Sequence, residues 1–404
     1  MSKSENKGDK TFTGISNRQL FLNHIAQTSP APISLEIIKA EGCSLWDING
    51  KEYLDLIGGI SVCNVGHRHP VVIDAIKDQL DNYLHVMVNG ELVLSPQTTY
   101  AKLLTDNLPP GLNSVFFTAS GTEATEGAMK LAKRVTGRTG IVAFNNSYHG
   151  STQGSLSVMG DEYWRNAFRP LLPDIMHLNY NSVEELGFIT DRTACVIAET
   201  VQAEAGVILP HKDWLKMLSE KCRSVGALLI LDEIQCGFGR NGTLWAFEQF
   251  DIVPDILLLG KALGGGMPMG AFVSDKKLMD HFTANPVLGH INTFGGHPVC
   301  CAAGLAAMQV LLNNDLVSTV NGKGELFVKG LVHPKIKSVQ NLGLMIAVEF
   351  ENFEENKKVI GRLLENGVFT DWFLFAPHCL RIVPPLVIKV EQIKKACELI
   401  VSCI

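Results

Sequence analysis

The feature that most constrains the fold is a series of short, continuously apolar segments, each followed by a polar turn or a helical pattern. Strands without polar alternation are typical of a sheet that helices cover on both faces. The sequence therefore predicts an α/β fold with a mostly parallel central sheet. The expected strands are SVFFT (114–118), GIVAF (140–144), ACVIA (194–198), ALLIL (227–231), DILLL (255–259) and GAFVS (270–274).

The two chain ends have a different pattern from this central block. Residues 33–60 contain short apolar runs around Asn49-Gly50, a dipeptide that strongly favours a hairpin turn. Near the other end we expect strands at 341–350 and 379–388 and a helix at 354–366. We therefore expect a small α+β domain built from both chain ends. The expected division is 1–60 (small domain), 61–310 (large α/β domain) and 311–404 (small domain).

Composition narrows the class of protein. The formal net charge of −6 offers no basic surface for nucleic acid, and no apolar run approaches the roughly 20 residues of a membrane span. The polar start, MSKSENKGDKTF, has no apolar core of a signal peptide. The ten cysteines are scattered without a C-x-x-C pair. We expect a reduced, cytoplasmic protein whose thiols pack as small apolar side chains.

The residues just after the strands are the functional candidates, because ligands of open α/β sheets bind outside the carboxyl ends of the strands. After 114–118, Ser120 and Glu123 have capping-box spacing and begin a helix that should stop at Gly137. Free N–H groups at such a helix start favour an anion such as phosphate. A capped helix that binds nothing is the alternative.

Acidic and aromatic residues follow the next strands. They are Tyr148 and His149, then Glu199, Gln202 and Glu204, then Asp232 and Glu233. An apolar strand that ends in Asp-Glu also resembles the magnesium-binding strand of nucleotide hydrolases. No P-loop and no G-x-G-x-x-G follows a strand, so a nucleotide-dependent enzyme is disfavoured.

Lys261 directly follows the strand at 255–259 and Gly260. Burial at the cleft edge would depress the pKa of its amine and make it a nucleophile able to form a Schiff base, whereas the alternative is a lysine that extends to solvent. Pyridoxal phosphate (PLP) requires such a lysine, backbone donors for its phosphate and an acid beside its pyridine nitrogen. Asp232 would supply about 4 kcal/mol there at an effective dielectric near 20, or about three pKa units.

From about residue 35 to 388 the sequence resembles the class III (subgroup II) aminotransferases of PLP fold type I, which include ornithine, acetylornithine and 4-aminobutyrate aminotransferases. The matching motifs are LWDINGKEYLDLIGGI, NVGHRHP, SGTEATEGAMKLA, NSYHG, ETVQAEAGV, LLILDEIQCGFGRNGTLWAFE, PDILLLGKALGGGMPMGA, NTFGGHPVCCAAG and RIVPPL. The resemblance implies PLP as cofactor and a homodimer with active sites at the subunit interface.

The resemblance also implies roles for individual residues. Lys261 matches the Schiff-base lysine, and Asp232 the partner of the pyridine nitrogen. The remaining cofactor positions are Gln235 beside the ring hydroxyl, Ile234 and Tyr148 on the two ring faces, Ser120, Gly121 and Thr122 in the phosphate turn, and Thr293 reaching the phosphate from the neighbouring subunit. Glu204 matches an acidic gate residue near the substrate, and Arg381 the arginine that binds a substrate carboxylate.

Ser151 departs from the family pattern. In relatives that use 2-oxoglutarate, the His-Gly pair is commonly followed by an arginine that binds a substrate carboxylate. A serine cannot supply that charge, so either glutamate is not the partner or another residue, such as Arg165 or Arg169, takes its place. His67 and His69 have H-x-H spacing without other ligands nearby, so we expect a turn there and no metal site.

The predicted function is a PLP-dependent aminotransferase. It would move the terminal (ω) amine of an ornithine-, acetylornithine- or 4-aminobutyrate-like donor to a 2-oxo acid, either 2-oxoglutarate or pyruvate. The alternatives are another PLP reaction on the same scaffold (a racemase, decarboxylase or aminomutase) and a catalytically inactive relative with a binding role. Lys261 and Asp232 argue against the inactive relative.

Overall fold

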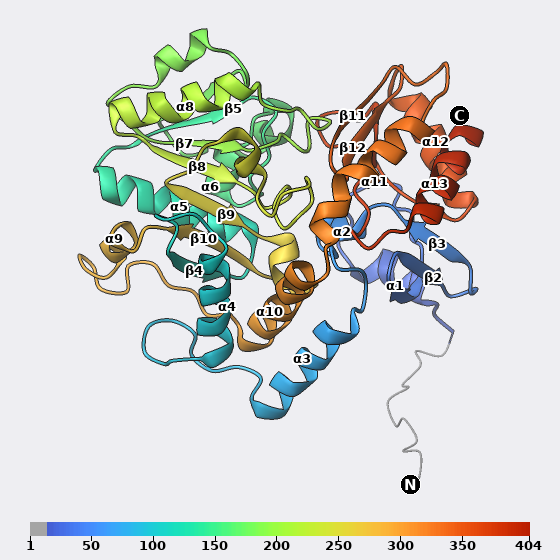
Figure 1. The fold of residues 1–404 in the computed structure, drawn as a ribbon, viewed down its shortest axis with the longest axis horizontal. Coiled ribbons are helices and arrows are strands. Elements are labelled where there is room, and N and C mark those ends of the chain that lie inside the picture. Colours follow the sequence, from blue (N-terminus) through green and yellow to red (C-terminus); the bar gives the residue numbers. More distant parts are fainter. Residues whose placement is uncertain (1–13) are drawn as a thin grey trace.

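The computed structural model describes residues 14–404, which form two lobes joined along α10 (Pro298–Asn313) (Figure 1). The larger lobe contains a seven-stranded sheet with strand order β4-β10-β9-β8-β7-β5-β6. Strands β5 to β9 pair in parallel, and β10 is antiparallel to both of its neighbours. The bounds are β4 (Ser114–Thr118), β5 (Gly140–Phe144), β6 (Ile175–Leu178), β7 (Thr193–Glu199), β8 (Leu228–Asp232), β9 (Ile256–Leu259) and β10 (Gly270–Ser274).

This sheet confirms the predicted α/β fold and its mostly parallel sheet. Strands β7, β8, β9 and β10 are almost completely buried, as their continuous apolar sequences require. Strand β6 is not among the strands predicted from the sequence. It lies at the sheet edge, is only partly buried and contains His177, so its sequence lacks the continuous apolar run of the inner strands.

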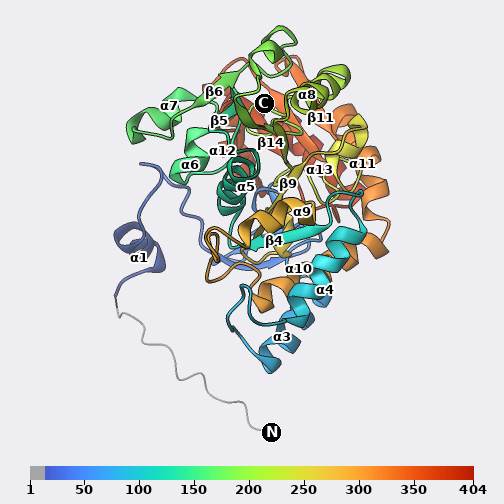
Figure 2. The same cartoon turned by 90° about the vertical axis from the view of Figure 1, so that its left-hand side faces the viewer.

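Helices cover both faces of this sheet and continue into the second lobe. The bounds in the larger lobe are α2 (Gly58–Ser61), α3 (Pro70–Asn82), α4 (Ser95–Asp106), α5 (Gly121–Thr136), α6 (Gln153–Ser157), α7 (Glu162–Arg165), α8 (Lys212–Val225) and α9 (Lys276–Met279). Short 3-10 helices span 166–168, 184–188, 246–250, 261–264 and 280–282. The helix α1 (Asn17–His24) buries none of its residues and lies at the periphery (Figure 2).

The smaller lobe is assembled from both chain ends. Its four-stranded sheet, β1-β2-β3-β13, pairs β13 from the C-terminal part in parallel with β3. A three-stranded antiparallel sheet, β11-β12-β14, lies beside it. The elements are β1 (Ile37–Glu41), β2 (Ser44–Asp47), β3 (Glu52–Asp55), α11 (Leu316–Gly330), β11 (Ser338–Leu342), β12 (Met345–Glu349), α12 (Phe353–Glu365), β13 (Val368–Phe369), β14 (Cys379–Ile382) and α13 (Val390–Ser402).

Two predicted strands were too long. The segment 341–350 is not one strand, because Gly343 (φ +57°) turns the chain between β11 and β12. The segment 379–388 forms a strand only to Ile382, since Pro384 and Pro385 carry no N–H for a ladder. The hairpin at Asn49-Gly50 is present between β2 and β3, and α12 matches the predicted helix to within one residue at each end.

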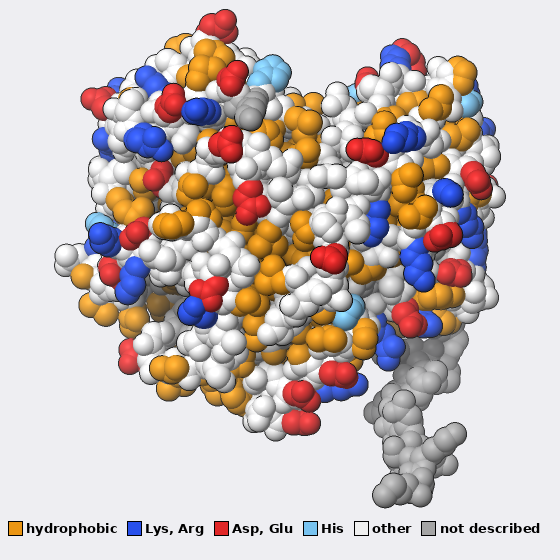
Figure 3. Space-filling view, viewed as in Figure 1, with side chains coloured by type: hydrophobic (Ala, Val, Ile, Leu, Met, Phe, Trp, Pro, Cys, Tyr) orange, Lys and Arg blue, Asp and Glu red, His pale blue; other side chains and the backbone are white. Residues whose placement is uncertain are grey.

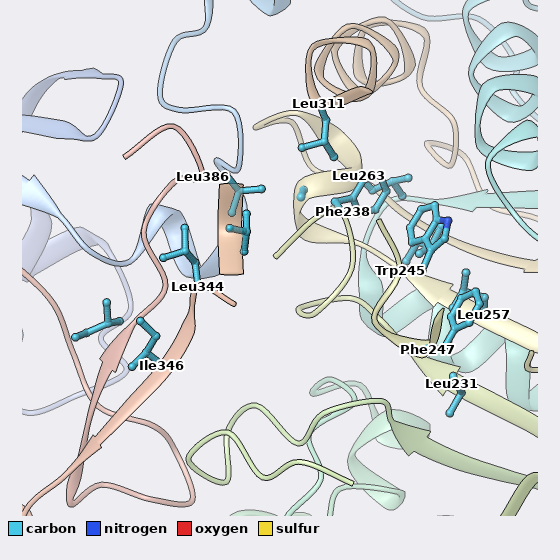
Figure 4. Close-up of a cluster of buried hydrophobic side chains, with 14 of the residues drawn as sticks. Leu231, Phe238, Trp245, Phe247, Leu257, Leu263, Leu311, Leu344, Ile346 and Leu386 are labelled. Atoms are coloured by element: carbon cyan, nitrogen blue, oxygen red, sulfur yellow. The ribbon is translucent and has the colours of Figure 1, made fainter. Parts of the chain in front are cut away.

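One hydrophobic core extends across both lobes (Figure 4). Leu231 and Leu257 on the central sheet, Leu263 and Leu311 between the lobes, and Leu386 in the smaller lobe belong to this single cluster. Continuous packing of this kind fixes the smaller lobe against the carboxyl edge of the sheet. All ten cysteines are free thiols, and every one but Cys63 is buried. Within residues 14–404, no single helix has the length and apolar character needed to cross a membrane.

Candidate active site

Lys261 lies at the carboxyl edge of the sheet, directly after β9 and Gly260. Its backbone is left-handed (φ +48°), a conformation that non-glycine residues rarely adopt outside constrained sites. Its Nζ donates to Gln235 Oε1 at 2.6 Å. Burial lowers the pKa of the amine, and the nearby Glu204 carboxylate opposes this only in part. The side chain does not extend freely to solvent, so the alternative considered from sequence is wrong.

Asp232 ends β8 and is paired before any ligand binds. Its Oδ2 lies 2.7 Å from His149 Nδ1, and its Oδ1 accepts the backbone N–H of Ile234 at 2.9 Å. The carboxylate is buried and has a histidine on one side. The other ring nitrogen, His149 Nε2, is buried and has no hydrogen-bond partner among the described residues. The pair thus leaves one imidazole nitrogen available beside the cavity.

Glu199, at the end of β7, ties two loops together. Its Oε1 accepts the backbone N–H of Tyr148 at 2.9 Å, and its Oε2 accepts that of Ala203 at 3.0 Å. Burial, with a further contribution from Asp232, raises the pKa of the Glu199 carboxyl to about 8. The sequence places Glu199 and His149 at this edge but predicts no specific partner for either. Their position just after or at the end of a strand was the available signal.

A cavity of about 190 Å³ opens where these strand ends meet. Most of the predicted cofactor-binding residues form its wall, together with His149 and Glu199, which have no assigned role. The lining residues are Gly121, Thr122, Tyr148, His149, Gly150, Glu199, Val201, Asp232, Ile234, Gln235, Cys236 and Lys261. The structure therefore brings the lysine, the acid, the aromatic ring and the helix start to one place.

The wall is shaped for a flat ligand at the start of α5. Ile234 packs directly on Gly121, where an added Cβ would come within 2.8 Å of the Ile234 side chain. Thr122 Oγ1 lies 2.8 Å from Thr152 Oγ1 and donates to Ser155 Oγ at 2.9 Å. The N–H groups at the start of α5 favour an anion at this end, although that of Glu123 is already bound within the chain.

Two of the predicted cofactor-binding residues are not part of the cavity wall. Ser120 caps α5, since its hydroxyl accepts the Glu123 N–H at 3.4 Å. The capping box is only half formed, because the Glu123 carboxylate accepts the N–H of Ala119 at 2.9 Å and not that of Ser120. Thr293 is exposed on the loop before α10. It does not reach the cavity of its own chain.

Glu204 and Arg381 form a buried bidentate ion pair between the lobes. Arg381 Nη1 and Nη2 donate to the two Glu204 oxygens at 2.8 and 2.7 Å. Burial acts to raise the pKa of the Glu204 carboxyl, but Arg381 and Lys261 outweigh it and the pKa is lowered. Glu204 and Arg381 both act electrostatically on the Lys261 amine, so the pair lies near it, although neither member lines the cavity.

The arginines considered as substitutes at Ser151 are already paired elsewhere. Arg165 Nε donates to Glu162 at 2.7 Å, and Arg169 Nη2 donates to the same carboxylate at 2.7 Å. Ser151 itself is exposed, with its Oγ 3.1 Å from the Tyr148 hydroxyl. Neither arginine lines the cavity, so the charge missing at position 151 is not replaced from these two positions.

Comparison with known proteins identifies the family. The family described as aminotransferase class-III matches residues 25–404. The chain is a class III aminotransferase. It is 39% identical over 378 residues to the acetylornithine aminotransferase of Methanopyrus kandleri, covering 92% of this chain and 94% of that protein. It is 38% identical over 368 residues to the [LysW]-aminoadipate semialdehyde/glutamate semialdehyde transaminase of Sulfolobus acidocaldarius, covering 90% and 92%.

Solved structures agree with this identification. The ornithine aminotransferase of Toxoplasma gondii superposes on this aminotransferase with a TM-score of 0.88 at 30% identity, covering 95% of this chain and 92% of that one. The aminotransferase is PLP-dependent, and its cavity suits that cofactor. Two buried polar atoms, His149 Nε2 and Gln235 Nε2, have no hydrogen-bond partner among residues 14–404. Such atoms are costly unless a ligand or water satisfies them.

Proposed function

We propose that this aminotransferase moves the terminal (ω) amine of an ornithine-, acetylornithine- or 4-aminobutyrate-like donor to a 2-oxo acid. The carrying observation is that the Lys261 amine and the Asp232 carboxylate open into one cavity, with the Glu204–Arg381 ion pair close to Lys261. The lysine and acid suit amine chemistry, and the ion pair suits a substrate carboxylate. The relatives named for acetylornithine and for semialdehydes support a terminal amine as the reacting group.

Different cavity residues would bind different parts of the cofactor. When bound, PLP supplies an aldehyde that condenses with amines and a ring that accepts electron density from the bond being broken. Asp232, itself oriented by His149, would face the pyridine nitrogen and keep it protonated. Tyr148 and Ile234 would cover the two ring faces, and Gln235 would lie beside the ring hydroxyl. The phosphate would bind at the start of α5, at Ser120, Gly121 and Thr122.

Lys261 would have two roles. Its amine would attach the cofactor covalently, as the Schiff-base lysine, and after release it would carry the proton that leaves the donor carbon. A buried amine with a lowered pKa suits both roles, because it is a better nucleophile and a better base at neutral pH than an exposed lysine. Gln235, 2.6 Å from Nζ, would orient the amine.

The Glu204–Arg381 pair would act as a gate. While it is closed, Glu204 occupies the Nη edge of Arg381, which suits a donor whose reacting end carries only an amine. For a 2-oxo acid, the carboxylate would take the place of Glu204 on the Nη edge of Arg381. Glu204 is held by small-lobe atoms, including the Leu374 N–H at 3.0 Å, so its release would be tied to small movements there.

A donor panel tests the proposed function. The PLP form of the protein is mixed with single amines (ornithine, N-acetylornithine, 4-aminobutyrate, a monoamine and an α-amino acid), and the cofactor absorbance is followed. Conversion of the terminal amines is expected. An α-amino acid should react only if it corresponds to the 2-oxo acid acceptor, because that half-reaction is reversible. The amino form is then mixed with pyruvate or with 2-oxoglutarate. Loss of the α-carboxylate or inversion at the α-carbon without amino transfer would instead indicate a decarboxylase or a racemase.

A homodimer would complete the site. Loop 287–294, which carries the exposed Thr293, lies beside segment 84–94, as the 3.0 Å bond between Asn89 Nδ2 and Asn292 Oδ1 shows. The two segments share a surface of exposed large apolar side chains, here called the apolar patch. Its members are Leu84, Met87, Leu92, Val93, Val287, Leu288, Ile291 and Phe294, each between 48% and 89% exposed. Exposed apolar side chains on two neighbouring segments support a protein interface at this surface.

Apolar side chains also gather over the middle of the face drawn in Figure 3. Exposed apolar atoms are common on soluble proteins, so this face alone does not indicate an interface. The dimer is therefore tested only at the apolar patch. Val93→Asp places a charge there and is expected to lower the molar mass measured by light scattering to that of one chain. Val332→Asp, at a valine that is 75% exposed in the smaller lobe, is the matched control. A monomeric wild-type protein would refute the dimer.

A further inference from the structure

Arg381 is paired with a second carboxylate, that of Asp371, besides Glu204. Its Nε lies 3.0 Å from Asp371 Oδ1, on the side of the guanidinium away from the Nη edge that Glu204 occupies. This contact is an ion pair without the alignment of a hydrogen bond. The guanidinium is fixed further by the Trp372 carbonyl, which accepts from Nη2 at 2.8 Å, and by the ring of Phe373 at 4.6 Å.

The two carboxylates differ in how they are anchored. Glu204 comes from the large-lobe loop after β7 and reaches Arg381 across the interface between the lobes. Asp371 belongs to the same sheet edge as Arg381, whose own N–H donates to the Asp371 carbonyl at 2.9 Å. A movement that frees Arg381 from Glu204 therefore leaves Asp371 in place. Asp371 is a permanent partner of the arginine, whereas Glu204 is an exchangeable one.

We propose that Asp371 is a positioning residue that sets how strongly Arg381 binds the carboxylate of the 2-oxo acid. This inference rests on the proposed function. A substrate carboxylate at the Nη edge meets a guanidinium whose charge Asp371 already balances, while the displaced Glu204 stays near. The cluster then holds three carboxylates against the one guanidinium of Arg381. Like charges at this range repel, and solvent screens this repulsion only in part, since the Asp371 side chain is 31% exposed and Arg381 is buried.

The surroundings of Asp371 determine the pKa of its carboxyl group. Burial raises the pKa of its carboxyl to about 6. Arg381 acts against this, and Glu204 and Asp55 act with it. Asp55 is itself paired with His67 at 2.6 Å. An incoming carboxylate favours the protonated form of Asp371, so binding of the 2-oxo acid should take up a proton. The KM for the 2-oxo acid should rise as the pH increases through about 6, because Asp371 loses its proton there.

The test compares the two half-reactions in the holoenzyme. Asp371→Asn keeps the shape of the side chain but removes its charge. At pH 8 the ratio of the KM for the 2-oxo acid to the KM for the amine donor is expected to fall about tenfold. Its rise between pH 5.5 and 7.5 should disappear. Asp371→Glu keeps the charge, so its ratio of the two KM values should stay close to that of the wild type. Glu351→Gln, at an exposed carboxylate paired with Lys337, is the control.

The outcomes separate this inference from the proposed function. An unchanged or increased ratio in Asp371→Asn, with the donor half-reaction still measurable, would overturn the role of Asp371 and leave the aminotransferase proposal standing. A wild-type protein that converts no amine donor would overturn the proposed function and the inference with it. Pre-steady-state mixing with each substrate alone distinguishes these results, because it measures the two half-reactions independently.

Discussion

The two halves of the site are built on opposite principles. The sheet-edge half, with Asp232, His149 and Lys261, contains buried polar atoms such as His149 Nε2 that have no hydrogen-bond partner in the described part of the chain. The gate half, with Glu204 and Arg381, is closed on itself by charge-assisted hydrogen bonds of 2.7 and 2.8 Å. A bound ligand can satisfy the polar atoms of the first half directly. In the second half Glu204 occupies the Nη edge of Arg381, so that edge must be opened before it can bind a substrate carboxylate.

This difference separates a resident ligand from an exchanging one. An unsatisfied buried donor favours a group that stays, because its loss leaves the desolvation cost uncompensated. A buried bidentate ion pair can be replaced by another carboxylate at little net cost, since the new anion makes the same two bonds. The sheet-edge half thus suits the cofactor, and the gate half suits substrates that enter and leave. Four variants test this contrast.

Lys261→Ala should have the largest effect. We expect amine-dependent conversion of the cofactor to fall by at least about 10⁴-fold, because both the covalent attachment and the proton carrier are lost. Lys276→Ala, at an exposed lysine of α9, is the control. Borohydride reduction followed by peptide mapping should label Lys261 in the wild type. A label on any other lysine, or a Lys261→Ala protein that keeps its activity, would refute the assignment.

The position of Lys261 was predictable because a lysine just after a buried strand is rare and easy to recognise. The inner strands were predictable because their sequences are continuously apolar. The partners of these residues were not predictable. Arg381 and Glu204 meet across 177 positions of the chain, and no local pattern indicates such a contact. The pairing of His149 with Asp232 likewise depends on the packing of β5 beside β7 and of β7 beside β8.

Asp232→Asn should have the next largest effect. Removing the charge lowers the affinity of the cofactor ring for its proton by about three pKa units, so we expect turnover to fall by about 10³-fold. Asp255→Asn is the matched control, since Asp255 lies at the opposite end of the neighbouring strand and accepts the Leu229 N–H at 2.8 Å. The cofactor absorbance as a function of pH reports the change. Activity within tenfold of wild type in Asp232→Asn would contradict this role.

Glu199→Gln should change how the stability of the cofactor-free protein depends on pH. The folded protein keeps the Glu199 proton up to about pH 8, whereas the unfolded chain releases it near 4.5. The free energy of unfolding should therefore fall as the pH rises through this window, by a few kcal/mol at most. The variant should show a shallower fall in urea titrations at pH 5, 6.5 and 8. Glu233, whose pKa burial raises to about 7, keeps part of the slope.

A slope as steep in Glu199→Gln as in wild type would show that Glu199 is ionised in the folded protein. The control is Glu391→Gln, at an exposed position in the first turn of α13. Adding the cofactor should also reduce the slope in the wild type. A cationic ring beside Asp232 offsets the repulsion that keeps Glu199 protonated.

Ser151→Arg should have the smallest effect. It tests whether the sheet-edge half can also be made to bind a substrate carboxylate. It adds a free cation to the sheet-edge half, next to the Tyr148 hydroxyl that now lies 3.1 Å from Ser151 Oγ. Because the position is exposed, a new arginine–carboxylate contact there should contribute only weakly to binding. The KM of donors that carry a carboxylate should fall by at most about tenfold, and the KM of a monoamine should not change. Ser151→Ala, which removes the hydroxyl without adding charge, should leave the donor preference as it is. If Ser151→Arg instead improved all donors equally, charge at position 151 would not discriminate between them, and Arg381 would remain the site's one carboxylate-binding cation in the described part of the chain.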